Sequence, residues 1–259
     1  MLAAVNTIMN RREWAMLVTL SVLWGGSFFF AEIALESLPP LTIVTLRVGL
    51  AAITLWLVVL ALKLPIPNSP PIWIAFFTMG LLNNVLPFSL IVWGQSQISS
   101  GLAAILNATA PLFGVIVAGI LLRDESATPL KITGVVIGFA GVIVMMDLSS
   151  IATSSLLAQL AILAAALSYA CASVYGRRFK ATGLNPILVA AGQVTGSTLL
   201  LLPIALWVDG NDHYANVPSQ VWAAIISLAV FSTAAAYILY FKLLASAGAT
   251  NILLVTLLV

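Results

Sequence analysis

Arg47 is the residue with the clearest chemical meaning in this sequence, because it places a guanidinium inside the apolar stretch Leu41–Leu62. The planar guanidinium fork matches the geometry of a carboxylate. An arginine at the centre of a membrane helix costs about 2.5–3.5 kcal/mol on insertion scales, so its side chain should face protein or water. Two interpretations follow. Arg47 either forms a structural pair with Glu32, at a comparable depth in the preceding stretch, or binds a substrate carboxylate.

Amide side chains form a second group of candidates. Asn83 and Asn107 offer both donors and acceptors to an amino or carboxyl group. Pro87 and Pro111 lie close by, and a proline removes a backbone hydrogen bond and opens the helix ladder. Open backbone inside a membrane is tolerated where it is buried in protein or lines a cavity. These asparagines therefore either line a cavity or form hydrogen bonds between helices.

Aromatic residues deep inside apolar stretches form a third group, namely Trp24, Tyr169 and Tyr237. Buried Trp and Tyr need partners for their N–H and O–H groups, so such a cavity suits an amphipathic solute of amino-acid size; aromatic packing is the alternative. Aromatic residues near the ends of stretches, which are typical of interfacial belts, are Trp93, Tyr175 and Tyr240. The candidate substrate-binding residues are Trp24, Asn83, Asn107, Tyr169 and Tyr237, and the candidate structural or gating residues are Arg47, Glu32, Pro87 and Pro111.

The elements that carry these residues are apolar stretches, each close to the ~20 residues that cross a bilayer. They run Trp14–Leu35, Leu41–Leu62, Trp73–Trp93, Leu102–Leu122, Leu130–Met146, Leu156–Tyr175, Ile187–Val208 and Val221–Phe241, followed by the shorter Ala249–Val259. With 62% hydrophobic and 7% charged residues, the composition is far from the ~25% charged residues of a soluble domain. We predict an all-α polytopic membrane protein embedded in the lipid bilayer.

The charged residues predict the orientation. If the N-terminus is cytoplasmic and the chain crosses at every stretch, every Lys and Arg outside the membrane lies on the cytoplasmic side. The opposite loops carry the acidic residues Glu36, Asp147, Asp209 and Asp212. This is the positive-inside distribution, and the expected location is a bacterial inner membrane. The net charge of +2 is small and most basic residues lie in loops, which argues against a nucleic-acid partner.

The sequence matches itself with a shift of roughly 145–150 residues, which indicates a duplication. Matched pairs include Pro40 with Pro186, Arg47 with Gln193, and Trp73 with Trp222. The uncharged counterpart of Arg47 favours its structural interpretation. The predicted repeats are residues 1–148 and 149–259. The first contains an odd number of stretches, so the second enters the membrane from the opposite side, as in secondary transporters with inverted repeats.

Several short motifs carry a family resemblance. They are Leu23-Trp24-Gly25-Gly26-Ser27-Phe28, Thr45-Leu46-Arg47-Val48, Ala110-Pro111-Leu112-Phe113, Leu122-Arg123-Asp124-Glu125 and Gly134 through Gly141-Val142. Their order resembles the EamA-type branch of the drug/metabolite transporter superfamily, and the overall pattern is most similar to the aromatic amino-acid exporter group. The resemblance implies ten transmembrane helices in two inverted five-helix repeats, cytoplasmic termini, export through a central cavity and no cofactor. About nine of these helices are expected here, the ninth incomplete, as in a shortened form of a ten-helix protein.

The predicted function is export of small metabolites, foremost aromatic or other neutral amino acids, by alternating access between the repeats. Exporters of drugs, nucleosides or lipids with the same fold are the alternative, because an aromatic cavity also suits apolar solutes. A channel would favour a continuous polar pore, and the mid-stretch polar residues are few. Glu32 is the only embedded candidate for proton coupling and lies near the outer rim, so we expect facilitated flow down the substrate gradient.

The sequence contains no motif that is typical of an enzyme active site. The acidic residues are scattered over separate loops, and the sequence has no glycine-rich phosphate loop. His213 is the only histidine, and with Asp209 and Asp212 it forms no recognisable closed metal site. We therefore expect neither a cofactor nor a metal.

Glycine spacing predicts close helix packing within each repeat, and the same surfaces could slide during rocking of the repeats. Gly134–Gly138 and Gly192–Gly196 both have the GxxxG spacing that lets two helix backbones approach. The sequence leaves the oligomeric state open, and a monomer is plausible.

Overall fold

The computed structural model describes residues 9–122, 128–145, 155–210 and 216–259, and all regular secondary structure in these ranges is helical. Within them, seven helical runs are long and apolar enough to cross a membrane. These runs are Arg11–Leu35, Pro40–Ala61, Pro70–Gln95, Ser100–Leu121, Leu156–Thr182, Pro186–Val208 and Ser219–Gly248. The predicted all-α polytopic membrane architecture agrees with them.

Several of the runs are built from more than one helix. The elements are α1 (Arg11–Leu35), α2 (Pro40–Ala61), α3 (Pro70–Gly80), η1 (Leu81–Val85), α4 (Leu86–Gln95), α5 (Ser100–Asn107), α6 (Ala110–Leu121), α7 (Pro129–Met145), α9 (Leu156–Gly176), α10 (Arg178–Thr182), α11 (Pro186–Val208), α12 (Ser219–Ala229), η3 (Val230–Ala235), α13 (Ala236–Leu253) and η4 (Leu254–Leu257). At 17 residues, α7 is shorter than the seven runs. Within α13, Gly248 has φ 87° and ψ 175°, a backbone conformation that suits glycine, and it separates the last long run from the predicted stretch that begins at Ala249.

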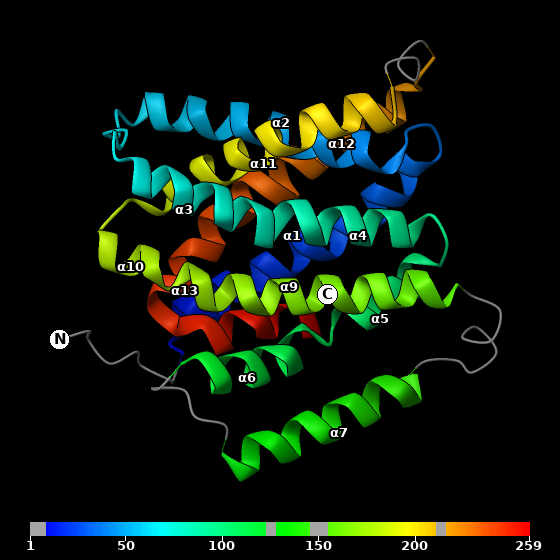
Figure 1. Ribbon diagram of the computed structural model, residues 1–259, viewed down its shortest axis with the longest axis vertical. Helices are drawn as coiled ribbons and strands as arrows, with labels where there is room; N and C mark the ends of the chain where they lie inside the picture. The colour runs from blue at the N-terminus through cyan, green and yellow to red at the C-terminus, as the bar shows by residue number, and fades with distance from the viewer. Residues whose placement is uncertain (1–8, 123–127, 146–154, 211–215) are drawn as a thin grey trace.

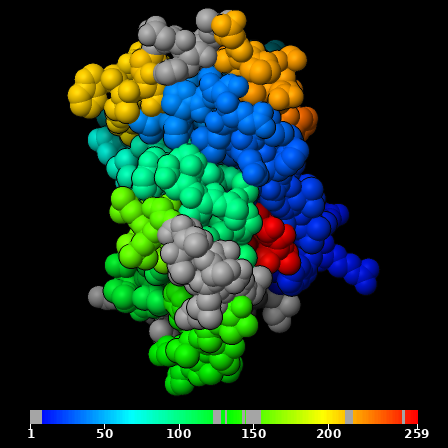
Figure 2. Space-filling view, turned by 90° about the vertical axis from the view of Figure 1, so that its right-hand side faces the viewer, coloured from blue at the N-terminus to red at the C-terminus, as the bar shows by residue number. Residues whose placement is uncertain are grey.

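The helices lie side by side in an elongated bundle (Figure 1). α2 packs against α11 and α12 at one end of the long axis, and α7 lies at the other end. Between these ends, α1 packs against α12 and α13, while α9 packs against α4, α5 and α6. Figure 2 shows the C-terminal residues reaching the surface between α1 and the run that contains α3 and α4. Helices from both halves of the chain therefore share one core.

The outward and inward surfaces differ in side-chain size. Large apolar side chains face outward, including Trp207 at 86% exposure, which suits contact with lipid tails. Inside, α9 presents a row of small residues, and the fully buried members of this row are Ala158, Ala165, Ala166, Ala170 and Ala172. Small side chains let neighbouring helices approach closely in a membrane, where van der Waals packing drives association.

Glycines decide the contact between α3 and α11. A Cβ added at Gly80 would lie 2.5 Å from the carbonyl oxygen of Gln193, and one added at Gly196 would lie 3.0 Å from Phe77 Cα. A Cβ at Gly192 would meet the Phe76 ring. The predicted close packing at the Gly192–Gly196 pair is therefore confirmed, but its expected place within one repeat is wrong, because α3 and α11 lie in different halves of the chain.

The second glycine pair behaves differently. A Cβ at Gly138 would meet Leu112, but nothing lies within 4 Å of one at Gly134. The predicted close contact is thus wrong at Gly134, because α7 lies at the edge of the bundle with that glycine exposed.

Two π-helical segments, η1 and η3, interrupt the runs Pro70–Gln95 and Ser219–Gly248. Pro87 has no N–H to donate to the carbonyl of Asn83, four residues earlier. That carbonyl accepts a hydrogen bond from Tyr237 Oη at 3.2 Å. In η3 the carbonyl of Ser232 accepts one from Arg47 Nη2 at 3.3 Å. Because lipid offers no donor, a carbonyl freed from the helix ladder must be satisfied inside the protein.

Serine side chains also donate hydrogen bonds to backbone carbonyls of neighbouring helices. Hydroxyl groups donate across helices from Ser168 to the Leu82 carbonyl at 2.7 Å and from Ser232 to the Leu23 carbonyl at 2.7 Å. Ser197 shares its one hydroxyl proton between the Gly80 carbonyl at 3.2 Å and the Gln193 carbonyl of its own helix at 2.8 Å. These bonds tie the interrupted helices to α9, α11 and α1.

The substitution Tyr237→Phe tests the role of these bonds. It removes the donor to the Asn83 carbonyl and to Asn84 Oδ1, leaving buried acceptors unsatisfied, and should destabilise the fold by about 1–3 kcal/mol. Thermal unfolding in detergent, followed by tryptophan fluorescence, measures the loss. Tyr240→Phe is the matched control, because Tyr240 is equally buried and its hydroxyl makes no hydrogen bond within the described part of the chain. Equal melting temperatures for the two variants would contradict the assignment.

The substitution Gly80→Ala tests the contact between α3 and α11. Its Cβ would meet the Gln193 carbonyl oxygen at 2.5 Å and Ser197 Oγ at 2.7 Å, so the helices must separate, at a cost of about 1–3 kcal/mol. Gly134→Ala, which meets nothing within 4 Å, should leave the melting temperature unchanged or raise it. The same unfolding measurement compares the two, and a Gly80→Ala protein as stable as the unmodified one would rule out the close approach.

Candidate functional site

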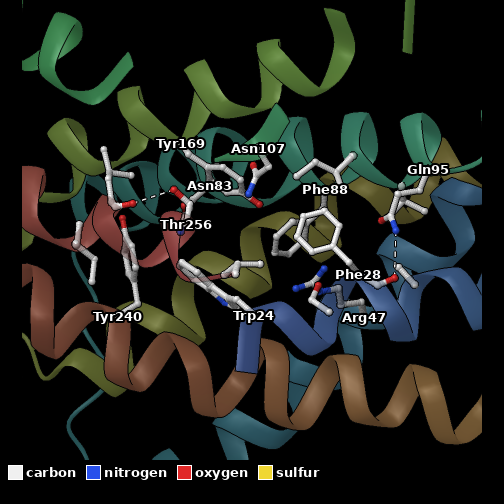
Figure 3. Close-up of a pocket in the computed structure, with 17 residues that line it drawn as sticks. Trp24, Phe28, Arg47, Asn83, Phe88, Gln95, Asn107, Tyr169, Tyr240 and Thr256 are labelled. Atoms are coloured by element: carbon white, nitrogen blue, oxygen red, sulfur yellow. Dashed lines mark hydrogen bonds between the residues drawn. The ribbon is translucent and has the colours of Figure 1, made fainter. Parts of the chain in front are cut away.

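A cavity lies where α1, α2, α4, α5, α9 and α13 converge (Figure 3). Its lining includes four of the five predicted substrate-binding residues, namely Trp24, Asn83, Asn107 and Tyr169, together with Arg47. Its volume is about 50 Å³. Pockets for small molecules usually measure about 300–1,000 Å³, so these helices must separate before a solute of amino-acid size fits.

Arg47 enters the cavity from α2 and is only 4% exposed. Its Nε donates to Thr233 Oγ1 at 2.8 Å, and its Cζ lies 3.7 Å from the centroid of the Phe88 ring. The predicted pair with Glu32 is not formed, because Glu32 lies on an exposed face of α1 while Arg47 turns toward η3. The partners of Arg47 are neutral oxygens and a ring face, and its charge meets no carboxylate among the described residues that line the cavity.

The amides of η1 form a hydrogen-bonded cluster with α11. Asn83 Nδ2 donates to Gln193 Oε1 at 3.3 Å, and Asn84 Nδ2 donates to Ser197 Oγ at 2.8 Å. The single hydroxyl proton of Tyr237 is shared between the Asn84 side chain and the Asn83 carbonyl. Tyr237 is 1% exposed and stands behind the cavity wall, so among the candidate substrate-binding residues it is the one that the lining excludes.

Asn107 occupies the end of α5, where the run breaks before α6. It is 5% exposed, and its buried Oδ1 has no hydrogen-bond partner. Pro111 lies in the first turn of α6 and Pro87 in the first turn of α4, and both are buried. Each of the two prolines therefore follows a break in its run, where the sequence predicted open backbone.

Aromatic rings form one wall of the cavity. The Trp24 ring lies 5.8 Å from that of Tyr240 and 6.4 Å from that of Tyr237, centroid to centroid. The prediction that Tyr240 belongs to an interfacial belt is wrong, since it is 3% exposed and lines the cavity. The reason is the length of its run, which continues to Gly248 and so places Tyr240 well inside.

Some lining residues carried little signal in the sequence. Gln95 lies at the end of α4, and its Nε2 donates to the Phe28 carbonyl at 3.1 Å and to Ser100 Oγ at 2.8 Å, joining three helices. Thr256 comes from η4, beyond the last long run. A polar residue near the end of an apolar stretch normally indicates an exposed position, so only the packing of helices identifies these two.

In the described ranges, no group of three or more His, Cys, Asp or Glu residues could hold a metal ion. Asp212 and His213 lie outside the described residues.

Comparison with known proteins shows the relationship of the chain. The model of the EamA-like transporter family matches residues 12–147 and 156–259. An uncharacterized transporter of Bacillus subtilis, YvbV, is 27% identical over 246 residues, which cover 93% of this chain and 78% of the relative. An uncharacterized inner membrane transporter of Escherichia coli, YedA, is 29% identical over 234 residues, covering 88% and 72%.

The fold is also found among solved structures. One crystal structure superimposes with a TM-score of 0.68 at 18% sequence identity, covering 96% of this chain and 86% of the other. At that identity the likeness concerns the fold alone. Family models that together match most of the chain establish a closer relationship. The protein is therefore a member of the EamA-like transporter family, a non-enzymatic multi-pass membrane transporter of small molecules.

Proposed function

We propose that this protein is a secondary transporter that exports small metabolites, foremost aromatic or other neutral amino acids, by alternating access. The observation that carries the proposal is the buried Arg47 guanidinium, which lines the cavity without a carboxylate partner. A buried charge is costly unless it is paired, so the site favours a ligand that supplies a carboxylate. Bidentate pairing of a guanidinium with a carboxylate gives both energy and orientation.

The aromatic rings in the cavity lining support a substrate with an aromatic or other apolar side chain. Trp24, Tyr240, Phe28 and Phe88 line the same cavity as Arg47. Aromatic and apolar side chains around a few polar groups are typical of sites for amphipathic molecules. A solute with a carboxylate at one end and an apolar or aromatic side chain at the other would satisfy both parts of the lining. A multidrug, nucleoside or lipid exporter of the same fold remains the alternative, favoured by the aromatic rings alone.

The proposed mechanism rests on the two halves of the chain as inverted repeats, residues 1–148 and 149–259. In support, α1 and α9 run in opposite directions (Figure 1), and each half contains a π-helical segment in its third run. Arg47 of the first half bonds to η3 of the second, while its counterpart Gln193 of the second half bonds to η1 of the first. In such transporters, rocking of one repeat against the other exposes a midplane site to each side in turn. We place the N-terminus in the cytoplasm of a bacterial cell, from the distribution of basic residues.

Transport in liposomes tests the proposed function. Vesicles containing the protein should show saturable flux of labelled phenylalanine, and Arg47→Gln should weaken its apparent affinity roughly ten- to hundredfold, the loss expected for a charge-assisted hydrogen bond. Arg12→Gln, at an exposed position of α1, is the matched control and should transport normally. If phenylalanine, threonine and leucine all fail to cross while a cationic dye does, the drug-exporter alternative replaces the amino-acid assignment.

The energy source is a second testable property. Within the described residues no Asp or Glu lines the cavity, and Glu32 is exposed, so we propose facilitated flow without proton coupling. Phenylalanine flux should therefore be indifferent to an imposed pH gradient, and Glu32→Gln should leave it unchanged. Accumulation of phenylalanine driven by a pH gradient alone, and abolished in Glu32→Gln, would overturn this part of the proposal.

A further inference from the structure

The Asn107 side chain is an unused hydrogen-bonding group in the cavity wall. It is 5% exposed and lines the cavity, and its Oδ1 is buried without a hydrogen-bond partner. Buried polar side chains are normally satisfied, so an orphaned acceptor in a cavity calls for an explanation. Rotation about the Cβ–Cγ bond exchanges the carbonyl and amino ends of an amide, so this side chain can offer its oxygen to whatever the cavity holds.

The other cavity-side amides use their amino groups within the protein. Asn83 donates to Gln193 and Gln95 donates to Phe28 and Ser100, so their donor groups serve the protein itself. The backbone around Asn107 is also open, since Pro111, four residues later, has no N–H for the Asn107 carbonyl. Asn107 is thus an amide of the lining with a free acceptor, at a break between α5 and α6.

Arg47 and Asn107 present opposite requirements to a ligand. Arg47 is a cationic donor from α2, and Asn107 supplies a neutral acceptor from α5, and the two enter the pocket from different sides (Figure 3). The described lining contains no Asp or Glu side chain that could pair with a ligand cation. A free amine would therefore face the like charge of Arg47 without compensation, whereas a molecule with both groups would neutralise Arg47 with its own carboxylate.

We propose that Asn107 is the specificity-determining residue that accepts a hydrogen bond from the α-ammonium group of a zwitterionic substrate, whose carboxylate binds Arg47. The inference rests on the proposed function, because it takes the same cavity as the transport site. The Trp24 and Tyr240 rings flank the cavity and add cation–π attraction for an ammonium group. The site thereby selects amino acids over both the corresponding carboxylic acids and the corresponding amines.

Three small probes separate these contributions. Phenylalanine carries both groups, 3-phenylpropionate lacks the amino group, and phenethylamine lacks the carboxylate. Binding of each to the purified full chain in detergent, measured by calorimetry, should place phenylalanine first, 3-phenylpropionate about tenfold weaker, and phenethylamine weakest. Tenfold corresponds to about 1.4 kcal/mol, the scale of one hydrogen bond to a charged group.

Two substitutions assign the preference to Asn107. Asn107→Leu keeps a similar volume without hydrogen-bonding groups and should bind phenylalanine and 3-phenylpropionate equally. Asn107→Asp supplies a carboxylate for the amine and should make phenethylamine binding stronger by at least tenfold. Gln97→Leu, at an exposed amide after α4, is the control and should retain the original order of affinities. Asn107→Asp is expected to strengthen phenethylamine binding, and a folding defect cannot produce a gain in binding. Its result therefore tests the role of Asn107 even if Asn107→Leu fails to fold.

The outcomes distinguish the two proposals. Equal affinity of the unmodified protein for phenylalanine and 3-phenylpropionate would overturn the role of Asn107 and leave the Arg47 anchor standing. Phenethylamine binding as tightly as phenylalanine would overturn the Arg47 anchor, and with it the proposed amino-acid transport. Binding of none of the three would overturn both.

Discussion

The satisfaction of backbone carbonyls inside the membrane is the constraint on which this structure depends. Helices in lipid can lose ladder hydrogen bonds only where the protein itself replaces them. Here the ladder is interrupted at η1 and η3. The replacement donors are side chains from distant parts of the chain: Tyr237 for the Asn83 carbonyl, Arg47 for that of Ser232, and Ser168 for that of Leu82. These interruptions thus specify which helices pack together.

The same bonds connect the fold to the site. Arg47 satisfies an interrupted helix with one part of its guanidinium, and this contact holds the charge in the cavity beside Phe88. A side chain with several donors can support a helix and still offer N–H groups to a ligand. The two interpretations of Arg47, structural and substrate-binding, are therefore compatible. The structural partner is η3 rather than Glu32.

Small residues let the helices approach closely enough for short polar side chains to form hydrogen bonds between them. Gly80 and Gly196 bring α3 within backbone contact of α11, and the serine and amide side chains between these helices are short. Larger side chains there would move η1 away from its partners. In the proposed mechanism, the helices around the narrow cavity separate, and a substrate exchanges its own hydrogen bonds for some of the contacts between them.

The sequence by itself determined the membrane class and the helical runs, because bilayer thickness imposes a length on apolar stretches that composition reveals directly. It also identified the cavity-lining residues Arg47, Asn83, Asn107 and Trp24 as candidates, since polar or amphipathic groups at mid-depth stand out against an apolar background. Only the tertiary structure decided their partners. Hydrogen bonds such as those of Arg47 with Thr233 and of Asn83 with Gln193 join residues more than one hundred positions apart, and no local pattern encodes which helix faces which. For the same reason, Tyr240 lines the cavity although the sequence did not predict it, and Tyr237 lies outside the lining although the sequence predicted it there. Packing rather than depth along a helix sets the direction of a side chain.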